Sequence, residues 1–166
     1  MDSDNSEIRD RKPRKLIIGI GNDYRGDDGV GVFVAGRLRE MGLPDIETRE
    51  ARGEGTELMT IWQGVETVIV VDAVYSKSEP GRVFRFEIGK DELQSAIFRG
   101  HSSHAFGLAE AINLASNLGS LPNKLIIYGI EGKSFETGEG LSVEIKKAAE
   151  LVISKIVEEV NRDGAH

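Results

Sequence analysis

The segment at residues 15–36 most constrains what this chain can fold into. Residues 16–20 form a short, β-branched apolar run that Gly21 closes, which predicts a strand buried on both faces. Over residues 30–38 apolar side chains recur at spacings of three and four, which predicts an amphipathic helix. A strand, a glycine-rich turn and a helix in this order are typical of α/β proteins, which place their sites at such turns.

The turn carries two adjacent aspartates in place of a phosphate-binding motif. A dinucleotide fingerprint would need a glycine where Tyr24 stands. A P-loop would need lysine and serine or threonine after Gly26, where the chain has Asp27 and Asp28, whose carboxylates would repel phosphate. The helix begins near this pair, and because one cap suffices we predict that Asp27 is its N-cap. Asp28 then becomes a candidate for binding a cation or a proton.

Strands and helices alternate along the rest of the chain. Further strands are predicted at residues 46–51, 67–74, 82–87 and 124–130, and further helices around residues 56–62, 104–118 and 142–160. This alternation predicts an α/β protein, a three-layer α/β/α sandwich around a mixed, mostly parallel sheet of five strands. The strand at 82–87 follows its predecessor closely, so it is predicted to be an edge strand antiparallel to that predecessor.

Length and composition favour one domain of a cytoplasmic protein. With 166 residues the chain can bury a sizeable core, and with no cysteine it can hold neither disulfides nor thiolate metal sites. A net charge of −7 argues against nucleic acid as a partner. Residues 1–14 are polar and lack the apolar core of a signal peptide, so we expect a disordered tail, a domain at 15–161 and a C-terminal tail at 162–166. No membrane partner is expected, and the protein is predicted to be a monomer.

Two further side chains accompany Asp28 as candidate site residues. Asp72 interrupts the apolar strand at 67–74 near its end, where a lone carboxylate would be costly to bury; the structural alternative is a local pair with Lys77. His104 falls in the first turn of a helix, where the helix dipole favours the neutral imidazole that binds metals; His101 is a weaker candidate. In such sheets the first and third strands lie side by side, so their carboxyl ends would bring Asp28 and Asp72 to one crevice.

The chemistry of this set is open to two interpretations. Two carboxylates and one imidazole suit zinc, nickel or manganese and leave coordination positions free. Without a metal, two neighbouring carboxylates would not both stay ionised and would form an aspartic dyad that can activate water. No G-x-S-x-G elbow and no H-E-x-x-H helix is present, so the sequence gives no support to serine hydrolase or zincin chemistry.

Four short motifs together resemble the hydrogenase maturation proteases. They read G-I-G-N at residues 19–22, G-D-D-G-V-G at 26–31, V-V-D-A at 70–73 and S-H-A-F-G-L at 103–108. Their order and spacing match that family, and the resemblance extends from residue 15 to about residue 160. The first two, taken together, are the most specific, and the other two add weight because they follow in sequence.

The resemblance implies an endopeptidase that removes the C-terminal extension of a nickel–iron hydrogenase large-subunit precursor after nickel insertion. By motif, Asp28, Asp72 and His104 would contact the metal, and Asp28 and Asp72 would be catalytic, as in an aspartyl protease. The nickel would be supplied by the precursor, although zinc or another divalent ion could occupy the site in vitro. A nickel-sensing assembly chaperone and, by fold-level analogy to phosphorylase/hydrolase-like sandwiches, a metal-dependent aminopeptidase-like hydrolase stay as alternatives.

The chain departs from the family pattern in the loop after the second predicted strand. Many members carry Gly-Thr there, whereas this chain has Arg52 and Gly53. The loop is expected to touch substrate, so the identity of the partner hydrogenase stays open.

Overall fold

The computed structural model describes residues 14–89, 103–138 and 140–163. Over these residues the chain forms one five-stranded sheet in the order β2-β1-β3-β5-β4. The strands are β1 (Lys15–Ile20), β2 (Ile46–Ala51), β3 (Thr67–Val74), β4 (Val83–Glu87) and β5 (Lys124–Glu131). The helices are the 3₁₀ turn η1 (Gly26–Gly29) and the α-helices α2 (Val30–Glu40), α3 (Gly55–Trp62), α5 (Ser103–Leu118) and α6 (Val143–Asp163).

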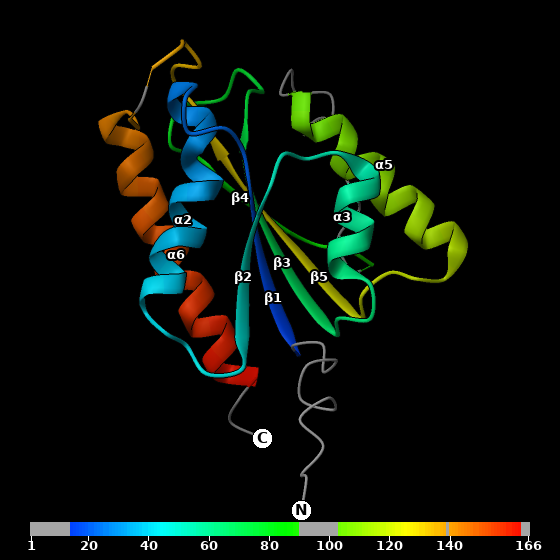
Figure 1. Cartoon of the computed structure of the whole chain (residues 1–166). Coiled ribbons are helices and arrows are strands. Elements are labelled where there is room, and N and C mark those ends of the chain that lie inside the picture. Colours follow the sequence, from blue (N-terminus) through cyan, green and yellow to red (C-terminus); the bar gives the residue numbers. More distant parts are fainter. Residues whose placement is uncertain (1–13, 90–102, 139, 164–166) are drawn as a thin grey trace, which may run out of the picture.

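The helices form a layer on each face of the sheet (Figure 1). Helices α2 and α6 lie against each other on one face, and α3 and α5 lie against each other on the other. Each face has its own apolar cluster, and neighbouring strand residues alternate between them: Ile17 packs toward α2 and α6, and Ile18 toward α3 and α5. The predicted three-layer sandwich and its mixed sheet are confirmed.

Strands β2, β1, β3 and β5 are parallel, and β1 lies directly beside β3, as predicted. The edge position of β4 and its antiparallel direction relative to β3 are also confirmed, although its hydrogen-bonded neighbour is β5, which lies between the two. Burial explains the order. Strand β5 is apolar and buried along nearly its whole length, which suits a central position, whereas β4 is only half buried, which suits an edge.

Helix α2 packs directly on the backbones of β1 and β3. A Cβ atom added at Gly31 would lie only 2.4 Å from the carbonyl oxygens of Ile20 and Val71. On the strand side, a Cβ at Gly19 would lie 2.1 Å from the carbonyl oxygen of Gly31. Only glycine permits so close an approach, and this contact fixes η1, which precedes α2, at the carboxyl ends of the strands.

No helix in the described ranges is long and apolar enough to cross a bilayer. Residues 1–13 and 164–166, which hold most of the two predicted tails, lie outside the described ranges.

Candidate functional site

The buried acidic side chains of the described residues all lie in the loops and strand ends at the carboxyl edge of the sheet. They are Asp27 and Asp28 in η1, Asp72 near the end of β3, and Glu131 at the end of β5, each at most 3% exposed. Because burying an unbalanced carboxylate is costly, each of them needs an explanation.

Asp27 binds the loop between β5 and α6. Its Oδ2 accepts hydrogen bonds from the backbone N–H groups of Lys133 and Ser134, both at 2.8 Å. The N–H of Ser142 donates to Oδ1 at 2.7 Å, and the Ser142 hydroxyl donates to Oδ2 at 2.9 Å. The prediction that Asp27 caps the helix is therefore wrong: the N-cap position of α2 is Gly29, and Asp27 satisfies a distant loop instead.

Glu131 likewise accepts hydrogen bonds from a loop, the one that follows β3. Its Oε1 accepts from the N–H groups of Ser76 at 2.8 Å and Ser78 at 2.9 Å, and its Oε2 accepts from the Ser76 hydroxyl at 3.0 Å. Glu131 stands opposite Val74 in the β3–β5 register, so the bonds close the turn at the point where β3 ends. The sequence did not predict this role of Glu131, because its position was assigned to a polar loop.

Asp28 lies in η1, directly after Asp27. Its Oδ2 accepts a hydrogen bond of 3.1 Å from the backbone N–H of Asn22, in the turn that leaves β1. The element that carries it, η1, contacts β3, the strand that carries Asp72. Asp72 is the sixth residue of that strand, is buried, and stands opposite Gly129 of β5. The structure therefore brings the elements of these two predicted site residues together at one edge.

His104 is the second residue of α5, so its backbone lies in the first turn of a helix as predicted. Its side chain, like the whole of His101, lies outside the described part of the structure. The start of α5 lies at the same edge of the sheet (Figure 1), because Gly107 packs on the loop after β2. A Cβ at Gly107 would lie 1.8 Å from the carbonyl oxygen of Gly53, so the helix and this loop are in backbone contact. Among the side chains that are described, no three acidic, histidine or cysteine residues form a metal-binding group.

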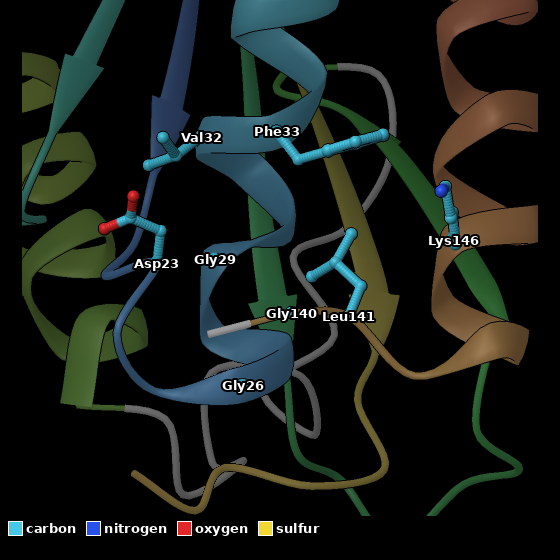
Figure 2. Close-up of a pocket in the computed structure, with 8 residues that line it drawn as sticks. All are labelled: Asp23, Gly26, Gly29, Val32, Phe33, Gly140, Leu141 and Lys146. Atoms are coloured by element: carbon cyan, nitrogen blue, oxygen red, sulfur yellow. The ribbon is translucent and has the colours of Figure 1, made fainter. Parts of the chain in front are cut away.

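Among the described residues, two pockets open close to η1 and the turn before it, and Asp23 lines both of them. One, of about 560 Å³, lies at the carboxyl ends of β1 and β2 and is lined by Gly21, Asn22, Asp23, Tyr24, Glu50, Ala51, Arg52 and Glu57. The other, of about 430 Å³, lies between η1, α2 and the start of α6. Figure 2 shows its wall, with Phe33 on α2, Leu141 before α6 and Lys146 on α6. Pockets of about 430 and 560 Å³ fall in the size range of ligand-binding sites.

Comparison with known proteins agrees with the resemblance seen in the motifs. The family model described as hydrogenase maturation protease matches residues 43–159. A putative hydrogenase maturation protease of Methanocaldococcus jannaschii is 33% identical over 158 residues, which cover 92% of this chain and 99% of that protein. The hydrogenase 2 maturation protease of Escherichia coli is 28% identical, with 91% and 93% covered.

A solved structure has the same fold. The hydrogenase maturating endopeptidase HybD from Escherichia coli superposes with a TM-score of 0.79 at 25% identity, over 91% of this chain and 94% of that one. The sequence match and the shared fold extend over nearly the whole described chain. This chain is therefore a peptidase that belongs to the hydrogenase maturation protease family.

Proposed function

We propose that this protein is the endopeptidase that removes the C-terminal extension of a nickel–iron hydrogenase large-subunit precursor once nickel has been inserted. Asp28, Asp72 and His104 contact the nickel carried by the precursor, so the metal belongs to the substrate. One observation carries the proposal. In a chain of this family, Asp28 and Asp72 are both buried, and the elements that carry them, η1 and β3, are in contact at the carboxyl edge of the sheet.

The other two buried acids have a structural explanation. Asp27 and Glu131 are each bound by several N–H and O–H donors of neighbouring loops, which gives them a structural role. Asp28 and Asp72 come from the loop after β1 and from β3, the neighbouring strands whose carboxyl ends form the usual ligand crevice of such sheets. Carboxylate and imidazole ligands suit a divalent nickel ion and leave it open positions.

The reaction is the hydrolysis of one peptide bond. One of the two carboxylates accepts a proton from a water molecule, and the water oxygen bonds to the scissile carbonyl carbon. The C–N bond then breaks, the proton passes from the carboxyl group to the leaving amine, and a carboxylic acid and an amine are the products. The nickel of the precursor, held by the same side chains, positions the scissile bond beside this water.

The pocket at the carboxyl ends of β1 and β2 could bind the part of the peptide chain next to the scissile bond. It adjoins Asn22, whose N–H holds the Asp28 carboxylate, and it includes Arg52 of the loop that departs from the family pattern. Arg52 is exposed, so it can meet a substrate side chain and contribute to the choice of precursor.

The proposal is tested with nickel-loaded and nickel-free precursor, each incubated with the unaltered protein and with Asp28→Asn or Asp72→Asn, and read by precursor mass. Asp45→Asn is the matched control. It also removes one negative charge, but from an exposed loop residue with φ of 61°, a conformation that asparagine tolerates well. We expect a loss of mass only with nickel present, with the unaltered protein and with Asp45→Asn.

Other outcomes would favour the alternatives. Nickel-dependent complex formation without a change in mass would support the assembly chaperone. Release of the chromophore from a chromogenic aminoacyl substrate in the presence of zinc would support an aminopeptidase-like hydrolase. Processing that persists in both aspartate variants would remove these carboxylates from the mechanism.

A further inference from the structure

The loop between β5 and α6 is joined to η1 at several points. Besides the four bonds to the Asp27 carboxylate, the Asp27 N–H donates to the carbonyl oxygen of Ser134 at 2.8 Å. The Gly26 N–H donates to the carbonyl of Gly138 at 2.9 Å, and the Gly138 N–H donates to the carbonyl of Tyr24 at 2.8 Å. The Asp27 side chain, which is 0% exposed, lies at the centre of this junction.

The donors around Asp27 match a carboxylate and not an amide. Oδ1 receives the Ser142 N–H, while Oδ2 receives the N–H groups of Lys133 and Ser134 and the Ser142 hydroxyl. An asparagine has only one side-chain oxygen, so in either orientation its NH₂ group would face at least one of these N–H groups. The bonds therefore require both oxygens of the Asp27 carboxylate as acceptors.

Asp27 and Asp28 are consecutive residues of one short 3₁₀ turn, so any shift of one backbone unit moves the other. One carboxylate is directed to the β5–α6 loop, and the other to Asn22 in the turn that leaves β1. The junction also builds a pocket wall. Gly26 and Gly29 of η1 line the pocket of Figure 2 together with residues 140–141, which directly precede Ser142.

We propose that Asp27 is a positioning residue: its buried carboxylate clamps the β5–α6 loop onto η1 and so sets the position of the Asp28 carboxylate and the width of the adjoining pocket. Its effect on turnover rests on the proposed proteolytic function. Asp27 itself does not touch the substrate; it acts through Asp28.

The clamp is tested by amide hydrogen exchange, followed by NMR, in the unaltered protein, Asp27→Asn and Ser142→Ala. In Asp27→Asn one side-chain oxygen remains, so either the Ser142 amide or the amides of Lys133 and Ser134 lose their acceptor, and the amides that lose it are expected to exchange about tenfold faster. The Asn22 amide, which donates to Asp28, is the decisive readout, and its exchange is expected to quicken as well. Asp45→Asn serves as the control and should leave all four amides unchanged.

Turnover is measured on the same proteins with nickel-loaded precursor. Asp27→Asn is expected to lower kcat of the folded protein by about 10- to 100-fold, because a small misplacement of a reacting group has effects of that size. Ser142→Ala keeps all the N–H bonds and loses only the hydroxyl bond, so we expect a change in the same direction but of only a few-fold. If Asp27→Asn does not fold, Ser142→Ala decides the question by the same measurements.

Two results would overturn the proposal. One is faster exchange at Lys133 and Ser134, or at Ser142, with an unchanged Asn22 amide, because Asp27 would then hold the β5–α6 loop without affecting Asp28. The other is an unchanged kcat in folded variants whose loop amides exchange faster. If the unaltered protein fails to cleave the precursor, the proposed function fails, while the Asn22 amide still reports whether the clamp sets Asp28.

Discussion

Replacing Gly31 by alanine tests how closely α2 is seated on the sheet. The added Cβ would lie 2.4 Å from the carbonyl oxygens of Ile20 and Val71 and 2.8 Å from the Ile20 nitrogen. Cβ atoms essentially never come within 3.0 Å of such atoms, so the helix would have to move outward by about 0.6 Å. All three atoms belong to backbone that is held in the sheet, so they cannot move aside.

The matched control is Gly36→Ala on the same helix. A Cβ at Gly36 meets nothing within 4 Å, so this change brings only the gain in helix propensity, about 0.5–1 kcal/mol of added stability. Gly31→Ala has the same propensity gain, but the overpacking costs about 1–3 kcal/mol or more in a close-packed interior. The free energy of unfolding of the two variants should therefore differ by about 1–3 kcal/mol, which separates their melting temperatures by roughly 2–12 °C in a protein of this size.

The assay is urea unfolding followed by circular dichroism, with the slope of the free energy against urea concentration compared among the three proteins. Equal slopes and a lower midpoint for Gly31→Ala would place the effect in the folded state. A Gly31→Ala protein as stable as Gly36→Ala would refute the close contact between α2 and the β1–β3 backbones, and with it the reason given for the position of η1.

Three further substitutions test other contacts at the carboxyl edge. Glu131→Gln would turn an NH₂ group toward N–H donors of the loop after β3, so we expect a loss of about 1–3 kcal/mol in urea unfolding; an unchanged midpoint would contradict this. Gly107→Ala would place a Cβ 1.8 Å from the Gly53 carbonyl oxygen, and a melting temperature equal to that of the unaltered protein would contradict this contact. The pKa of Glu144 is lowered by its own backbone N–H and then by Lys133, so Lys133→Ala should raise that pKa only part of the way in an NMR titration. Because the folded pKa is depressed, the stability from Glu144 is present at neutral pH and is lost as the pH falls through that pKa.

Much of the architecture could be predicted from periodicity alone. The apolar runs that became β1, β3 and β5 have no solvent-facing alternation, which is the pattern of central parallel strands, and the helices carry apolar stripes of the expected spacing. The neighbour of β4 could not be predicted in this way. A short turn favours pairing with the preceding strand, but β5 follows in sequence and inserts between the two, because its buried length stabilises the sheet more than β4 could.

The sequence could predict at which edge of the sheet the candidate site residues lie, because strand ends and glycine turns are local signals. Asp28 and Asp72 were both expected at the carboxyl ends of neighbouring strands, and their elements meet there. The role of Glu131 was not predictable, since its donors belong to a loop more than fifty residues earlier in the chain. Which of the buried acids bind loops depends on contacts of this long range.

The adjacent pair Asp27 and Asp28 illustrates why. In the sequence both precede a helix, both could cap it, and only one cap is needed, so local rules assign the cap to the first of them. The donors that bind Asp27 lie more than one hundred residues away, at Lys133, Ser134 and Ser142, and they come into reach because β5 lies beside β3 in the sheet. These bonds take Asp27 from the helix cap and join the β5–α6 loop to η1, which also carries Asp28. The carboxylate at the first position thus binds a loop that no local rule could identify, and the chemical role proposed for the one at the second position is a separate question for the processing assay.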